Sequence, residues 1–342
     1  MPGNANMVTV WEKDPSSGRT RQAPKPDVNK LPLGFYFPPP EPPVSDDTDS
    51  EDFRYWVAAE ALRRGADFWT PCLAPPPKWA PGNTLQVRPD TIYDDLNSDY
   101  DGAVLTFSHG SAPANPGLVV YAGATPDILC HELGHAVLHA LNINLWPPGG
   151  TELEAFKESF GDMSAILCAL QVSEFRDTLL AETQAAGNFW ISSSLSRVAE
   201  QFGKVVRAVA PEDADKDCLR NAWNHHNYEA PATIANRQGP DVLTVSSHSF
   251  SRVFTGAFYE AFAAMFTARA ANKATRSLEL QIASTHMRDI LAASVVNAQR
   301  RDDFFAHVAA RMVDASAGKD ASYPAIFTDV FTRRSILPGA IA

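Results

Sequence analysis

The pattern best able to carry chemistry is a His-Glu-x-x-His motif at residues 131–135. The surrounding residues predict one helix over 126–142, on which His131 and His135 lie one turn apart on the same side. Both imidazoles can therefore bind one metal ion, and Glu132 beside them can reach a water molecule on that ion. Two imidazoles and a carboxylate, with a fourth position open for water, suit Zn²⁺. We predict a single zinc ion here, with Glu132 as the general base.

The carboxylate that completes this ligand set is expected on the next predicted helix, over 152–172. Glu158 and Asp162 stand four residues apart there, on one helix face, among apolar neighbours that predict burial. Buried carboxylates need partners, so this face is expected to bind a cation. We favour Glu158 as the third ligand, with Asp162 accepting a hydrogen bond from the imidazole of His131. The alternative is Glu154 as the ligand, with Glu158 in the orienting position.

The ends of these two helices are predicted from capping residues. Thr125 is expected to cap the first helix with its hydroxyl, and Pro126 suits the first helical position. A Trp-Pro-Pro-Gly-Gly run at 146–150 ends that helix. Thr151 and Glu154 have the spacing of a capping box at the start of the next helix. The two helices are therefore expected to be joined by a short connection.

These motifs resemble those of the thermolysin-like zinc metallopeptidases, the glutamate-ligand branch of the zincins (gluzincins). The resemblance rests on the segment HELGH and on the later segment ESFGD. It implies a zincin fold and zinc-dependent hydrolysis of peptide bonds. It also implies five site residues: the zinc ligands His131, His135 and Glu158, the base Glu132 and the orienting Asp162.

A further candidate lies at residues 246–251, where a serine-rich segment opens a long apolar helix. The resemblance implies that His248, near this helix start, stabilises the oxyanion that forms when a carbonyl is attacked. Asp241 is a candidate for orienting His248. The tyrosine that assists the oxyanion in the family has no counterpart in the loop after the first motif, so Tyr228 and Tyr259 are the candidate substitutes.

Proline usage and strand-like segments indicate how the chain is organised. Of its 26 prolines, 16 lie at or before Pro89, which predicts an extended, partly disordered or strap-like segment over 1–50. A β-containing lobe with both motif helices is expected over 51–172, and a mainly α-helical lobe that completes the cleft over 173–342. The expected fold class is α+β, with a small mixed sheet N-terminal to the helical lobe. Three segments have the composition of strands: 84–88, 103–107 and 118–122.

Either of the last two strand-like segments, 103–107 or 118–122, is a candidate for the sheet edge to which a peptide substrate adds as a further strand. Composition also limits the partners. The 342-residue chain carries 29 Lys and Arg against 40 Asp and Glu, a formal charge of −11, which argues against nucleic-acid binding. No apolar stretch is long enough for a membrane span.

The start of the chain lacks the pattern of a signal peptide, which favours the cytoplasm and leaves export by a non-Sec route open. The expected partners are a peptide or protein substrate and one zinc ion, with calcium binding left open. The proline-rich segment is also a candidate docking site for a protein partner. Two further functions are compatible with the sequence: an interaction protein on an inactive or narrowly specific zincin scaffold, and a zinc hydrolase of a non-peptide amide.

Overall fold

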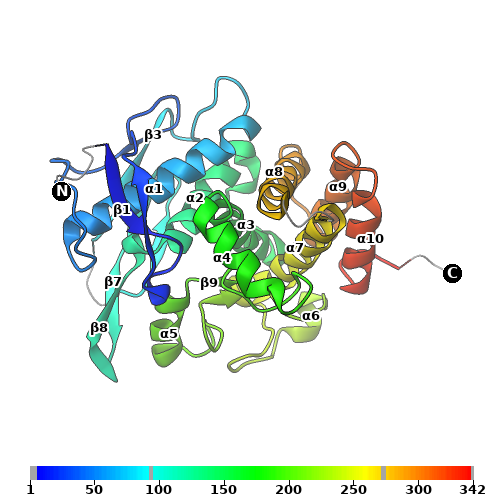
Figure 1. The fold of residues 1–342 in the computed structure, drawn as a ribbon. Coiled ribbons are helices and arrows are strands. Elements are labelled where there is room, and N and C mark those ends of the chain that lie inside the picture. The colour runs from blue at the N-terminus through cyan, green and yellow to red at the C-terminus, as the bar shows by residue number, and fades with distance from the viewer. Residues whose placement is uncertain (1–5, 92–94, 271–274, 340–342) are drawn as a thin grey trace.

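The computed structural model describes residues 6–91, 95–270 and 275–339. The strands are β1 (Met7–Trp11), β2 (Thr20–Pro24), β3 (Gly34–Tyr36), β4 (Thr84–Arg88), β5 (Ser98–Tyr100), β6 (Val104–Phe107), β7 (His109–Ala112), β8 (Asn115–Tyr121), β9 (Arg197–Val198) and β10 (Arg220–Asn221). The helices are α1 (Glu51–Trp69), α2 (Pro126–Leu141), α3 (Thr151–Ala169), α4 (Ser173–Gln184), α5 (Glu200–Val209), α6 (Pro231–Ile234), α7 (Ser247–Arg269), α8 (Arg276–Val295), α9 (Phe304–Ser316) and α10 (Tyr323–Arg333). Strands β1 to β8 lie on one side of the molecule and α7 to α10 on the other, with α2 and α3 between them (Figure 1).

Four strands form a small mixed sheet in the order β3-β4-β6-β5. Strands β3, β4 and β6 run parallel, and β5 runs antiparallel to β6 at the sheet edge. In β4 the side chains alternate between exposed and buried, and Leu85 and Val87 point into the core. The predicted strand 84–88 is β4. The predicted strand 103–107 corresponds to β6 and lies inside the sheet, whereas 118–122 overlaps β8, which pairs with β7 instead.

The proline-rich N-terminal segment packs against the lobe that follows it. Strands β1 and β2 form a hairpin, β1 packs on α1, and β3 joins the mixed sheet beside β4. Phe35 in β3 is fully buried, and the indole N–H of Trp56 on α1 donates to the carbonyl of Pro43. Of the segment predicted over 1–50, residues 1–5 lie outside the described residues. From residue 6 onward, this segment contributes strands and core residues to the fold.

A buried ion pair joins the N-terminal hairpin to the start of α2. Lys13 Nζ lies 2.6 Å from Asp127 Oδ2 and 2.8 Å from the carbonyl oxygen of Arg197, and the side chains of Lys13 and Asp127 are both almost fully buried. The Asp127 carboxylate also accepts the backbone N–H of Ala199. This pair therefore connects β1, the helix of the first motif and the segment that precedes α5.

Removal of this lysine is expected to destabilise the whole chain. The substitution Lys13→Met should lower the free energy of unfolding by about 3–5 kcal/mol, because it leaves the buried carboxylate of Asp127 without its counter-charge. Lys30→Met is the matched control, since Lys30 pairs with Asp67 at the surface and its loss should cost less than about 1 kcal/mol. Urea unfolding followed by circular dichroism measures both. Equal midpoints for the two variants would contradict the prediction.

Helices α2 and α3 pack closely because glycines face each other across their interface. A Cβ atom on Gly134 of α2 would lie 2.8 Å from Cβ of Ser164 and 2.9 Å from Cα of Gly161, both on α3. A Cβ atom on Gly161 would lie 2.6 Å from the imidazole ring of His131. Since real Cβ contacts are not this short, neither position tolerates a side chain without a shift of the helices. The two glycines allow the side chains of both motif helices to reach one point.

The helix caps differ from those predicted. Thr125 is the N-cap of α2, but its hydroxyl donates to a carbonyl of the preceding turn and caps no helix N–H. Helix α3 begins at Thr151 with Gly150 as its N-cap, so the predicted capping box is wrong. The carboxylate of Glu154 instead accepts the backbone N–H of Gly149, just before the helix.

The C-terminal half is mainly helical, as predicted. Helix α7 packs on α3, α8 and α10. Aromatic side chains fill the region between these helices and α9: Phe156, Phe254, Phe304, Phe305 and Phe331. None of the described helices is both long enough and apolar enough to cross a membrane.

Candidate metal centre

A cleft of about 570 Å³ lies where β5, the two motif helices, α5 and the start of α7 meet. Ser98 and Tyr100 of β5 line one part of it, and Phe202 and Val206 of α5 line an apolar part. The predicted ligands His131, His135 and Glu158 line the same cleft, together with Glu132 and His248.

Three of the predicted ligands converge in this cleft. Nε2 of His131 lies 3.1 Å from Nε2 of His135. The carboxylate of Glu158 approaches both rings, with Oε2 3.4 Å from Nε2 of His131 and Oε1 3.8 Å from Nε2 of His135. In a tetrahedral site with zinc–ligand bonds of about 2.0–2.2 Å, ligand atoms lie about 3.3–3.6 Å apart. The separations in this structure are close to that range.

The donor set fits a divalent cation on chemical grounds as well. His131, Glu132 and His135 are buried and place potential ligand atoms within 4.8 Å of one another. Oε2 of Glu158 is buried and makes no hydrogen bond, although it lies within ion-pair distance of His131 and His248. A buried carboxylate oxygen without a hydrogen bond is costly unless a cation compensates it. The residues therefore fit a metal ion bound by two imidazoles and the Glu158 carboxylate.

The two imidazoles differ in their electrostatic environment. Burial acts to lower the pKa of His131, but the hydrogen bond to Asp162 and the nearby carboxylate of Glu158 outweigh it and raise the pKa to about 9. Burial lowers the pKa of His135 to about 3. Although burial acts in the opposite direction, the neighbouring imidazoles of His131 and His248 hold the pKa of Glu158 well below its usual range. The carboxylates of Asp162 and Glu158 both face His131, and because a metal ligand must be deprotonated, a bound cation would compete with a proton for this ring.

Asp162 and Arg220 form the second layer around His131. Oδ1 of Asp162 lies 3.0 Å from Nδ1 of His131, and since an ionised carboxylate only accepts, Nδ1 carries the hydrogen. This tautomer leaves Nε2 of His131 free to bind a metal. Nε of Arg220 donates to both oxygens of Asp162 at 2.8 Å, and all three side chains are buried. Burial acts to raise the pKa of Asp162, but the Arg220 guanidinium and His131 outweigh it and lower the pKa.

Glu132 directly follows the first proposed ligand, His131, on α2. Its carboxylate contacts β5. Oε1 of Glu132 accepts a hydrogen bond of 2.7 Å from the hydroxyl of Ser98. Burial raises the pKa of Glu132 above its ordinary value, which makes its carboxylate a stronger base. The predicted base therefore lines the same cleft as the predicted ligands.

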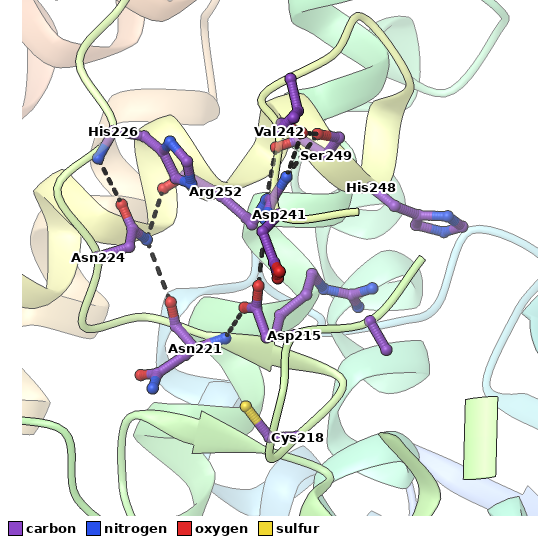
Figure 2. A network of polar contacts seen from close by, with 12 residues as sticks. Asp215, Cys218, Asn221, Asn224, His226, Asp241, Val242, His248, Ser249 and Arg252 are labelled. Atoms are coloured by element: carbon purple, nitrogen blue, oxygen red, sulfur yellow. Dashed lines mark hydrogen bonds and ion pairs between the residues drawn. The ribbon is translucent and has the colours of Figure 1, made fainter. Parts of the chain in front are cut away.

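His248 stands at the first turn of α7 with half of its side chain exposed. Its Nε2 lies 3.2 Å from Oε2 of Glu158. Figure 2 shows its ring pointing away from a polar network in which Arg252 contacts Asp215 and Ser249. This network anchors the start of α7, so that His248 faces the cleft.

Asp241 is paired with Arg207 and not with His248, which it was expected to orient, and Glu154 is not brought into the ligand set. Both carboxylate oxygens of Asp241 are paired with Arg207, at 2.9 and 3.0 Å, on the exposed surface. The carboxylate of Glu154 pairs with Lys157 at 2.9 Å and is partly exposed. The structure thus places Glu158, and not Glu154, against the two imidazoles.

The two tyrosines considered as substitutes lie outside the cleft lining. The hydroxyl of Tyr228 donates to Glu152, and the hydroxyl of the fully buried Tyr259 contacts Ser193. Among the residues that the structure describes, Tyr100 is the tyrosine that lines the cleft, and its hydroxyl donates to the carbonyl of Gly102.

Comparison with known proteins gives one kind of match. No protein-family model matches this chain, and no curated protein sequence matches it. Its structure is similar to that of the precursor of protealysin, a metalloproteinase from Serratia proteamaculans. The TM-score is 0.52 at 14% sequence identity, over 98% of this chain and 89% of that chain. The likeness is one of fold. It confirms the α+β, thermolysin-like fold class that the sequence predicts, and the same structure holds the candidate metal site of the His-Glu-x-x-His motif.

Two residues at this candidate metal site were not predicted from the sequence. Arg220 lies on β10, a strand of two residues, and no local pattern marks it as a partner of Asp162. Ser98 lies on β5, a strand of three residues that precedes the first motif by more than 30 positions. Both strands are too short for an alternation of polar and apolar residues to indicate which side chains face the cleft.

Proposed function

We propose that this chain is a zinc-dependent metalloendopeptidase. The observation that carries the proposal is the convergence of two imidazoles and one carboxylate beside a buried glutamate, all facing one cleft. In this proposal, His131, His135 and Glu158 hold the ion. When bound, zinc would supply a Lewis acid and lower the pKa of a water molecule. The similarity in fold to a metalloproteinase precursor supports the same reaction class.

The remaining side chains have roles that follow from their positions. Glu132 takes up the proton of the attacking water at its carboxylate and returns it to the leaving amine. Asp162 holds the tautomer of His131, and Arg220 keeps Asp162 ionised. His248 lies beside Glu158, with its Nε2 3.2 Å from Oε2 of that residue. It donates a hydrogen bond to the carbonyl oxygen of the substrate as negative charge develops on that oxygen.

Two features of the cleft support a peptide over a small amide as the substrate. Strand β5 lines the cleft and forms the edge of the mixed sheet, so one row of its backbone groups is available to a further strand. The apolar residues of α5 offer a surface for an apolar side chain next to that edge.

The proposal is tested with the purified chain and a library of quenched peptides. We expect cleavage by the zinc-loaded chain, loss of cleavage after zinc is removed with a chelator, and recovery when zinc is restored. Mass spectrometry of the products identifies the bonds that are cut. A chain that binds zinc stoichiometrically but cleaves no peptide would contradict a peptidase and favour an interaction protein.

A further inference from the structure

Among the residues that the structure describes, the hydroxyl of Ser98 is the hydrogen-bond partner of the Glu132 carboxylate. The distance from Ser98 Oγ to Glu132 Oε1 is 2.7 Å. A carboxylate that is ionised can only accept, so the hydroxyl donates, and the length is typical of a charge-assisted O–H···O⁻ hydrogen bond. Glu132 is buried, whereas Ser98 is half-buried at the border of the cleft.

This contact determines how the carboxylate of Glu132 is oriented. The last torsion of a glutamate side chain is broad, so packing alone does not select which oxygen faces the cleft. The Ser98 hydroxyl fixes Oε1 on the β5 side and leaves Oε2 as the oxygen available to a proton. A general base must stand within hydrogen-bond reach of the proton that it accepts, and small displacements of such a group lower the rate strongly.

The strand that carries Ser98, β5, is also the edge strand of the mixed sheet at the cleft. Strand β5 pairs with β6 on one side, with Ser98 opposite Phe107, and lies at the edge of the sheet on the other. It also packs directly against α2, the helix of Glu132. A peptide that adds to this edge therefore lies along the same short strand that orients the base.

We infer that Ser98 is a positioning residue for the general base, which couples the docking of a peptide on β5 to the orientation of the Glu132 carboxylate. This inference rests on the proposed peptidase function. It requires no contact between Ser98 and the substrate, because Ser98 acts through Glu132.

The test compares Ser98→Ala and Ser98→Thr with Ser111→Ala, a serine of β7 that does not line the cleft. Ser98→Ala should lower kcat by about 10-fold to 100-fold with KM and zinc content unchanged. Ser98→Thr keeps the hydroxyl and suits a strand, so it should recover most of the rate. Ser111→Ala should match the wild type.

Four outcomes would overturn the inference. The first two are an unchanged kcat in Ser98→Ala and a rise in its KM at constant kcat, which would make the hydroxyl a substrate contact. The others are a loss of zinc in Ser98→Ala and a failure of Ser98→Thr to recover the rate. The proposed function fails separately, if the wild type itself cleaves no peptide.

Discussion

Replacing Glu132 with glutamine is expected to lower kcat by about 10²-fold to 10⁴-fold while zinc content stays at the wild-type level. The amide keeps the size of the side chain and can still accept the hydrogen bond from Ser98. It cannot take up a proton from water. Because the proposed ligands are His131, His135 and Glu158, the metal should be retained. Steady-state kinetics and metal analysis on the same preparation give both readouts.

The matched control for this substitution is Glu174→Gln, an exposed glutamate at the start of α4 that lies outside the cleft. It changes the net charge of the chain by the same amount and should leave kcat at the wild-type value. If Glu132→Gln retains wild-type turnover, the proposed role of Glu132 as general base is refuted even if zinc is present. If it loses zinc, Glu132 is part of the ligand set.

Removal of Arg220 is expected to have a comparably large effect, on stability as well as on the site. Arg220→Met should lower the free energy of unfolding of the metal-free chain by about 3–5 kcal/mol, because Asp162 is then left buried without its strongest counter-charge. It should also weaken zinc binding by about 10-fold to 100-fold, since the orientation of His131 depends on Asp162.

Arg237→Met is the control for Arg220→Met, because Arg237 pairs with Glu229 on the surface and its removal should leave the unfolding midpoint unchanged. The double variant Arg220→Met/Asp162→Asn should cost less than the sum of the two single changes, because the unpaired buried charge is then absent. Urea unfolding of the wild type, Arg220→Met, Asp162→Asn, the double variant and Arg237→Met measures these differences. Additive costs would contradict a coupled Arg220–Asp162 pair.

The parts of the site that could be predicted from the sequence lie within single helices. On a helix, the spacing of His131 and His135, and that of Glu158 and Asp162, determines which side chains share a face. The structure places all four around one point, with Asp162 against His131. The α+β fold class could also be predicted, because strand-like segments precede the first motif and helical segments follow it.

The parts that could not be predicted depend on tertiary contacts. Arg220 reaches Asp162 only because the pairing of β9 with β10 brings its short strand to the cleft. Asp241 was expected beside His248 from its place in the chain, but the stronger partner for its carboxylate is the guanidinium of Arg207. Gly161 faces His131 because of how the two helices pack, which helix periodicity alone does not determine.

The measurement that most directly tests the central claim is the metal content of the wild type, Glu158→Ala and Glu154→Ala, each dialysed against zinc and then against metal-free buffer. We expect about one zinc ion per chain in the wild type and in Glu154→Ala, and a loss of zinc in Glu158→Ala, because the third ligand is then missing. A wild type that retains no zinc, or a loss of zinc in Glu154→Ala but not in Glu158→Ala, would contradict the metal centre described for this chain.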